Sequence, residues 1–467
     1  MKNRKTLIRI VLGVIILAFV LYQQLFKQNS DSNDTEKIAG FDKSKYSEMV
    51  KREFIHAWNG YKKYAYGHDA LKPLSKSFRD WYGESLYMTP VDAFDTMILM
   101  GLAEEANETK NLILENLSFD KNLSVQNFEI TIRLLGGLIS AYQLDGDQKF
   151  LDLAVDLADR LMPVFDSKTG IPYRYVHLQS GKISDKFNNP AEAGTLMLEF
   201  GTISKLTGDD KYYNAAKKAL VEIFNRRSDI GLVGTVIDAE TGKWINTDSH
   251  ISGMIDSYYE YLIKSWILFE DDDFKMMFDK SINAVNTHLA DITDSGLWYT
   301  YADMNTGEKL KTQFGALDAF FPAVLLLGGN KFRAEQLVES CYKMWKLHGI
   351  EPEQIDYSTM EVLSADYNLR PEFAESLYYL YNETNDEKYL VMGVEVLESL
   401  IKYCKTEHAY AALRNVITKE KKDDMESFLF AETFKYLFLL FAEGNSINLN
   451  DFVFNTEAHP IAKNFNK

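Results

Sequence analysis

Several segments of the chain begin with a lysine next to an aromatic residue and continue with apolar residues at helical spacing. One such segment follows Phe150 and carries apolar residues three or four positions apart: Leu153, Ala154, Leu157, Ala158, Leu161 and Met162. A second segment follows Tyr212 and carries Ala215, Ala216, Ala219, Leu220 and Ile223. This spacing places one apolar stripe along a helix. Both segments are therefore predicted to be amphipathic helices with one buried face.

This pair of a lysine and an aromatic residue recurs about every sixty residues along the chain. Its aromatic members are Phe150, Tyr212, Phe274, Phe332 and Tyr389, which stand 62, 62, 58 and 57 residues apart. A period of this length is too long for one helix and holds a pair of helices. The repeat therefore predicts an array of helical hairpins.

The first helix of each hairpin is apolar nearly all round, as residues 132–139 and 376–381 illustrate. Such helices are buried on most sides, so they form an inner layer beneath the amphipathic ones. Seven first helices are predicted to start near Val91, Phe128, Glu192, Asp256, Leu317, Glu372 and Glu426. We expect an all-α fold, a closed seven-hairpin α/α barrel (toroid) over residues 41–467. An open superhelical solenoid is the alternative.

The N-terminal residues have a different pattern. Lys2, Arg4 and Lys5 precede thirteen unbroken apolar residues at 10–22. Residues 1–27 are predicted to be a cytosolic basic tip and a signal-anchor helix, and residues 28–40 a polar linker. The lack of a small-x-small motif favours an uncleaved anchor over a cleaved signal peptide.

This orientation predicts a single-pass membrane protein. Its main domain would lie in the ER or Golgi lumen, or outside the cytoplasm if the protein is bacterial. Asn-x-Ser/Thr sequons agree with a secretory route; they occur at Asn33, Asn107, Asn116, Asn122 and Asn382.

Composition narrows the possible functions. The chain has 467 residues with a formal net charge of -17, which disfavours a nucleic-acid partner. Cys341 and Cys404 are the only cysteines, so a disulfide framework or a cysteine-based zinc site cannot form, and we expect two buried thiols. The eight histidines include no His-x-x-x-His pair, and no P-loop, nucleophile elbow or dinucleotide motif occurs.

Acidic residues lie near the predicted starts of most inner helices. They are Asp92, Asp95, Glu129, Glu192, Asp256, Glu372, Glu426 and Glu432. An acid in a first helical turn complements the helix dipole and needs no further role. However, several of these acids lie in apolar sequence, where a carboxylate must be paired, hydrogen-bonded or metal-bound.

A toroid would bring the starts of the inner helices to one face, with Arg133 and Arg370 among the carboxylates. This arrangement suits glycoside hydrolysis by paired carboxylates, or the binding of a hard cation.

Seven segments together resemble glycoside hydrolase family 47, the class I α-mannosidases. They are residues 66–73, 91–97, 128–142, 256–264, 369–376, 425–433 and 455–460, which span most of the chain in unbroken order. The resemblance implies a seven-hairpin α/α barrel with a C-terminal plug. It also implies a calcium-dependent, inverting exo-α-1,2-mannosidase that trims terminal mannose from high-mannose N-glycans or glycoproteins.

The resemblance also implies roles for individual residues. The three acids at the scissile bond match Glu129, Asp256 and Glu372, with Glu129 as general acid through a water and Glu372 as the leading candidate for the base. The residues that match sugar-contacting positions are Arg133, Glu192, Arg370, Phe428 and Glu432. Thr456 matches the direct calcium ligand, and Glu375, Glu432 and Glu457 would hold the ion through water.

Two positions depart from the family pattern. Ala316 and Ala319 stand where processing mannosidases of the family have a histidine and a disulfide-bonded cysteine. This region is more similar to the branch that marks misfolded glycoproteins for degradation. A mannose-binding, lectin-like quality-control factor with weak catalysis is therefore an alternative, and a helical scaffold whose acids are only helix caps is a third.

Overall fold

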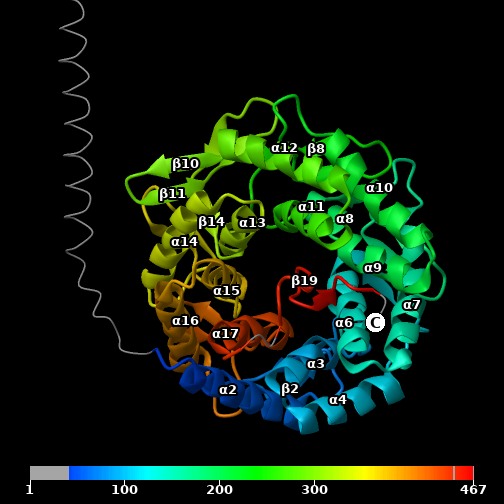
Figure 1. The fold of residues 1–467 in the computed structure, drawn as a ribbon, viewed down its shortest axis with the longest axis vertical. Helices are drawn as coiled ribbons and strands as arrows, with labels where there is room; N and C mark the ends of the chain where they lie inside the picture. The colour runs from blue at the N-terminus through cyan, green and yellow to red at the C-terminus, as the bar shows by residue number, and fades with distance from the viewer. Residues whose placement is uncertain (1–40, 445–446, 466–467) are drawn as a thin grey trace, which may run out of the picture. The chain divides into compact units, whose positions relative to one another are not determined.

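Residues 41–444 and 447–465 are described in the computed structural model (Figure 1). The predicted signal anchor at 1–27 and the linker at 28–40 lie outside the described residues. Within the described ranges, no helix combines the length and the apolar character needed to cross a membrane.

The helices form two concentric layers. The outer layer consists of α2 (Lys43–Tyr64), α4 (Ala103–Asn116), α7 (Gln148–Leu161), α10 (Lys211–Asn225), α12 (Asp272–His288), α14 (Lys331–Lys346) and α16 (Glu387–Ser399). The inner layer consists of α3 (Met88–Met100), α5–η1–α6 (Asn127–Ile130, Thr131–Leu135, Gly136–Asp145), α8–α9 (Pro190–Gly194, Met197–Thr207), α11 (Asp256–Phe269), η3–α13 (Leu317–Phe320, Phe321–Leu327), α15 (Glu372–Thr384) and η5–α17 (Leu429–Thr433, Phe434–Phe441). Two short segments, η2 (Met162–Phe165) and η4 (Leu400–Cys404), extend outer helices.

The predicted repeat and the closed toroid are confirmed. Each aromatic residue of the repeat lies in the first turns of an outer helix, from α7 to α16. The last inner helix, α17, packs against the first outer helix, α2, and this contact closes the ring (Figure 1). Four of the five aromatic residues are buried, whereas Phe332 is 70% exposed, so its position in the repeat does not reflect core packing.

The all-α prediction missed many short strands. They are β1 (Ala70–Lys72), β2 (Ser77–Arg79), β3 (Ser124–Gln126), β4 (Tyr175–His177), β5 (Ile183–Ser184), β6 (Phe187–Asn188), β7 (Val236–Asp238), β8 (Trp244–Asn246), β9 (Asp248–Ser249), β10 (Ala290–Thr293), β11 (Gly296–Tyr299), β12 (Tyr301–Asp303), β13 (Lys309–Lys311), β14 (Gln313–Gly315), β15 (Gln354–Asp356), β16 (Glu361–Ser364), β17 (Leu413–Asn415), β18 (Glu420–Lys421), β19 (Phe452–Phe454) and β20 (Pro460–Ala462). They pair as small antiparallel sheets, for example Ala70 opposite Arg79 in β1–β2. Strands of two to four residues are too short to show a period-two pattern in the sequence.

Most of these strands lie in the loops that lead from an outer helix to the start of the next inner helix. Because the barrel alternates outer and inner helices, these loops and the starts of the inner helices share one face.

A C-terminal plug, residues 452–462 with β19 and β20, enters the ring (Figure 1). It passes the inner helix at Gly136 and Gly137. A Cβ on Gly136 would collide with the Asn455 amide of the plug, and one on Gly137 would lie 2.6 Å from Val91 Cγ1. The glycine pair therefore permits close packing of the plug and α3.

Both cysteines are buried and free, as expected. The four sequon asparagines within the described residues, Asn107, Asn116, Asn122 and Asn382, are exposed.

Candidate active site

A cavity of about 310 Å³ opens among the starts of the inner helices, with the plug on one side. All eleven residues that the family resemblance implied line it: Glu129, Arg133, Glu192, Asp256, Arg370, Glu372, Glu375, Phe428, Glu432, Thr456 and Glu457. The toroid thus brings these side chains together from segments more than 300 residues apart in the chain.

Three acids reach the cavity from three different inner helices. Glu129 lies on α5, and Asp256 and Glu372 are the first residues of α11 and α15. Burial raises the pKa of Asp256 to about 6, although the Ser257 amide bonds its carboxylate. Burial also raises the pKa of Glu372 to about 8, against the opposing effect of Arg370.

The carboxyl groups of Glu129 and Glu372 each lie beside an arginine but are held differently. Arg133 Nε donates to Glu129 Oε2 at 3.0 Å. Arg370 Nη1 lies 3.8 Å from Glu372 Oε1, while Glu372 Oε2 is buried without a hydrogen-bond partner among the described residues. Glu129 is therefore fixed by a charged donor, whereas Glu372 keeps one oxygen free to accept a proton.

Both arginines are held by other acids. Arg133 also pairs with Glu457, and Arg370 binds Glu353 through Nε at 3.0 Å and Nη2 at 3.1 Å. The Phe428 ring lies between them, 5.8 Å from the Arg133 guanidinium and 5.9 Å from that of Arg370.

Glu192 is fixed by a partner that the sequence did not indicate. Its carboxylate accepts two hydrogen bonds from Arg174, at 2.7 and 2.8 Å. Its backbone nitrogen donates to the side chain of Asn189, which caps α8. Arg174 follows no motif, and only the fold brings it to Glu192.

Three further carboxyl groups line the cavity. We call Glu375, Glu432 and Glu457 the carboxylate floor. Burial raises the pKa of Glu375 to about 7 and that of Glu457 to about 8, with Lys264 and Arg133 as the respective opposing cations. Burial and the other acids raise the pKa of Glu432 well above its usual range.

These donors fit a hard cation, because they are all oxygen atoms and their charge is not balanced by neighbouring bases. Thr456 lines the same cavity between the plug strands, and its backbone nitrogen donates to Tyr261 Oη at 3.4 Å. Among the described residues, no three acidic, histidine or cysteine side chains stand close enough to chelate a metal directly.

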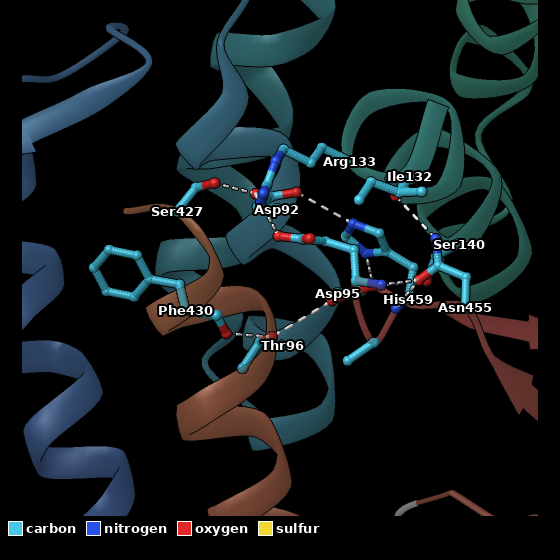
Figure 2. A network of polar contacts seen from close by, with 12 residues as sticks. Asp92, Asp95, Thr96, Ile132, Arg133, Ser140, Ser427, Phe430, Asn455 and His459 are labelled. Carbon is cyan, nitrogen blue, oxygen red and sulfur yellow. Dashed lines mark hydrogen bonds and ion pairs between the residues drawn. The ribbon is translucent and has the colours of Figure 1, made fainter. Parts of the chain in front are cut away.

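Asp92, Asp95 and Glu426 do not line the cavity, although they were expected to face it. Asp92 and Asp95 form a buried network with the plug (Figure 2). His459 Nδ1 lies 2.7 Å from Asp95 Oδ2, and Nε2 lies 3.2 Å from Asp92 Oδ1. Lys435 Nζ lies 2.8 Å from Asp95 Oδ1. Glu426 pairs with Arg79 on the β1–β2 hairpin.

The two alanines that depart from the family pattern are buried and do not line the cavity. Between them, Asp318 is also buried; burial raises its pKa to about 7, and one of its oxygens accepts from the Gly315 amide at 2.8 Å. The departure is thus accommodated by packing, with no opening toward the cavity.

Comparison with known proteins agrees with the fold. The family model for glycosyl hydrolase family 47 matches residues 53–463. The endoplasmic reticulum mannosyl-oligosaccharide 1,2-alpha-mannosidase of Homo sapiens is 38% identical over 443 residues, covering 87% of this chain and 62% of its own length. The ER degradation-enhancing alpha-mannosidase-like protein 2 of Mus musculus is 35% identical over 463 residues, covering 90% and 78%.

Among solved structures, the alpha-1,2-mannosidase from Trichoderma reesei has a TM-score of 0.84 at 29% identity, covering 91% of this chain and all of its own. The cellobiose 2-epimerase from Bacillus thermoamylovorans shares the fold at 13% identity, with a TM-score of 0.57. The family match and these identities show that the chain belongs to glycosyl hydrolase family 47 and is a glycosidase.

Proposed function

We propose that the protein is a calcium-dependent, inverting exo-α-1,2-mannosidase that trims terminal mannose from high-mannose N-glycans or glycoproteins. The observation that carries this proposal is the complete set of acids, Glu129, Asp256 and Glu372, around one cavity. The names of the human and fungal relatives support the substrate class.

Inverting hydrolysis needs an acid on the leaving-group side and a base that activates water on the opposite side. Glu129 is the proposed acid: it donates its proton, through a water, to the glycosidic oxygen as the bond to the anomeric carbon breaks. Glu372 is the proposed base and takes a proton from the attacking water. Its raised pKa makes the ionised carboxylate a stronger base. Asp256 is the rival or the helper of Glu372.

The remaining residues bind and orient the sugar. Arg133, Glu192 and Arg370 supply polar contacts, and Phe428 offers an apolar face to the mannose ring. Each polar group is already held by an ion pair, so little ordering is needed when the sugar binds.

Thr456 would hold calcium directly, with Glu375, Glu432 and Glu457 acting through water. When bound, the ion supplies positive charge that offsets the carboxylate floor and oxygen-ligand sites that sugar hydroxyls can occupy.

A nine-mannose N-glycan incubated with the purified protein, with and without a calcium chelator, tests the proposal. We expect mannose release that stops on chelation and returns when calcium is added. Proton NMR of the first turnovers should show the β-anomer of mannose, the product of inversion. Chelator-resistant release would reject the calcium requirement, and initial release of the α-anomer would reject inversion.

Thr456→Val tests the metal assignment against a matched control, Thr287→Val, on the exposed face of α12. Calcium at a hundred times its Kd stabilises a protein by about 2.7 kcal/mol. We expect Thr456→Val to lose most of this gain in unfolding free energy and Thr287→Val to keep it. Equal gains in both variants would remove Thr456 from the site.

A lectin-like quality-control factor is the second candidate. It is favoured by Ala316 and Ala319 and by the similarity to the mouse degradation-enhancing protein. Tight binding of the nine-mannose glycan without release of mannose, in the presence of calcium, would establish it in place of the enzyme.

We also propose that residues 1–27 anchor the protein with its catalytic domain in the lumen of the ER or Golgi, or outside a bacterial cytoplasm. The endoplasmic reticulum location in the name of the human relative supports a lumenal domain. Protease added to sealed ER or Golgi vesicles should spare a lumenal domain, whereas protease added to bacterial spheroplasts should digest an extracytoplasmic one. Digestion in the vesicles without detergent, or protection in the spheroplasts, would contradict this orientation.

A further inference from the structure

An aromatic side chain outside the cavity stacks on one of the cavity arginines. Trp81 follows strand β2 and precedes α3, and it does not line the cavity. The centre of its ring lies 5.2 Å from the Arg133 guanidinium. A second ring, that of Phe428, lies 5.8 Å from the same guanidinium. Arg133 is therefore contacted by two aromatic rings as well as by its acids.

These contacts belong to a longer alternating column. The Arg79 guanidinium lies 5.7 Å from the Trp81 ring, and the Arg370 guanidinium lies 5.9 Å from the Phe428 ring. The order along the column is Arg79, Trp81, Arg133, Phe428 and Arg370. It runs from the β1–β2 hairpin to the arginine beside the proposed base. A guanidinium is attracted to an aromatic face, and the attraction is strongest where water is excluded.

The backbone holds Trp81 firmly in place. Its nitrogen donates to Asp69 Oδ2 at 3.1 Å, and Asp69 Oδ1 accepts from the Leu86 nitrogen at 2.7 Å. Asp69 is fully buried, so one carboxylate ties both ends of the loop that carries Trp81. The Trp81 ring is half-buried, and its Nε1 has no hydrogen-bond partner among the described residues. Stacking on the neighbouring guanidinium groups is thus the polar contact that its side chain makes.

We infer that Trp81 is a positioning residue, which fixes the plane of the Arg133 guanidinium and through it the proposed acid, Glu129. The inference rests on the proposed function. Arg133 Nε donates to Glu129 Oε2 at 3.0 Å, so a rotation of the guanidinium displaces the carboxyl group that protonates the leaving oxygen. Ion pairs alone fix where Arg133 lies, whereas the two rings also restrict its tilt.

Substitution of Trp81 separates this role from sugar binding. On α-1,2-linked mannobiose we expect Trp81→Leu to lower kcat about tenfold with KM changed less than twofold. Trp81→Phe keeps an aromatic face and should retain kcat within threefold of wild type. The matched control is Trp266→Leu, because Trp266 is also half-buried, stacks on Lys275 at 5.5 Å and lies away from the cavity. Trp266→Leu should leave kcat unchanged.

A substrate whose leaving group needs little protonation shows whether Trp81 acts on the acid-catalysed step. Fluoride leaves α-mannosyl fluoride with little protonation, so Glu129 contributes less to its hydrolysis. The kcat loss of Trp81→Leu should fall from about tenfold on mannobiose to less than twofold on the fluoride. An equal loss on both substrates would overturn the inference, as would equal impairment of the Leu and Phe variants. A rise in KM at constant kcat would instead place Trp81 in direct contact with the glycan.

A failure of the inference can be distinguished from a failure of the variant to fold and from a failure of the proposed function. If Trp81→Leu does not fold, Trp81→Met, with a longer apolar side chain, carries the same expected split. If wild-type protein released no mannose, the proposed function would fail and the inference with it. If wild type is active and Trp81→Leu behaves like Trp266→Leu, the inference alone fails.

Discussion

Two sets of carboxylates inside the barrel, those of the plug network and those of the cavity, differ in what neutralises them. In the network of Figure 2, Asp95 contacts both Lys435 and His459. Burial opposes ionisation of Asp95, but these cations lower its pKa to about 2. In the cavity, burial raises the pKa of Glu372 to about 8. The two acids therefore differ in the charges that surround them.

The difference separates structural acids from reactive ones. Lys435 Nζ also donates to the Ala458 carbonyl at 2.6 Å, so the balanced network fastens the plug to α17 and α3. The cavity acids have fewer cations than carboxylates, and Glu372 Oε2 lacks a partner among the described residues. Unbalanced groups of this kind are available to bind a cation or to move a proton.

The largest expected effect comes from Glu372→Gln. The amide cannot take a proton from water, so we expect kcat to fall by about 10³-fold, within the range typical of general acid–base catalysis. Folding should be preserved, because the amide replaces a buried carboxyl without a charge to desolvate. Mannose release and thermal unfolding measure the two effects.

Glu361→Gln is the control for Glu372→Gln, because Glu361 is exposed on β16. It should leave both activity and stability unchanged. If Glu372→Gln retained near wild-type release, Glu372 would not be the base and Asp256 would take its place.

In the buried network with the plug, Asp95→Asn should instead lower the stability of the protein. This change leaves Lys435 and His459 buried without their carboxylate, and breaking such a group costs about 3–5 kcal/mol of unfolding free energy. The surface pair Lys275–Asp279, at 2.6 Å, is the control, and Asp279→Asn should cost less than about 1 kcal/mol. Urea unfolding measures both, and equal costs would show that the network does not fasten the plug.

Much of the fold could be predicted from the sequence. The aromatic residues from Phe150 to Tyr389 mark five outer helices, and all but the exposed Phe332 are buried in the core. The short strands were missed because they arise when chain segments pair within a loop or between neighbouring loops. Ala70 opposite Arg79 is a local example, and Asp248 opposite Asp303 is a distant one.

The sequence motifs located the acids near the starts of the inner helices. They could not show which acids line the cavity and which belong to the buried network with the plug. Asp92 and Glu129 both lie in apolar sequence near the starts of inner helices. The partner that distinguishes Asp92, His459, stands 367 residues away. Arg174 and Trp81 were missed for the same reason, because their partners Glu192 and Arg133 meet them only in the folded barrel.

Acidification should act on the two sets in opposite directions. The folded-state pKa of Glu372, about 8, lies above its unfolded value of about 4.3, so its contribution to stability is present at low pH and lost as pH rises through 8. That of Asp95, about 2, lies below its unfolded value of about 3.9, so its contribution is lost as pH falls from about 4 to 2.

With chelator present, Tm should therefore rise as pH falls from 8 to 5 and decline below 4. Thermal unfolding across this range checks both limbs. Glu372→Gln should flatten the upper limb and Asp95→Asn should remove part of the lower one. A Tm that falls steadily from pH 8 to 5 in wild type would contradict the assignment of raised pKa values to the cavity.

The smallest expected effect tests whether a hydrogen bond from an uncharged side chain contributes to the stability of the network. Ser140 Oγ donates to Asp95 Oδ2 at 2.9 Å from α6 and is fully buried. Ser140→Ala removes one hydrogen bond to a charged group. Loss of such a bond typically lowers the free energy of unfolding by about 1.5–3 kcal/mol. Because His459 and Lys435 still contact Asp95, we expect a loss of about 1 kcal/mol.

Ser265→Ala is the matched control, because Ser265 Oγ is equally buried and has no hydrogen-bond partner among the described residues. Its loss should be neutral or slightly stabilising in urea unfolding. If the two variants were equally stable, the cations alone would hold Asp95, and the balance that distinguishes this network from the cavity would be purely ionic.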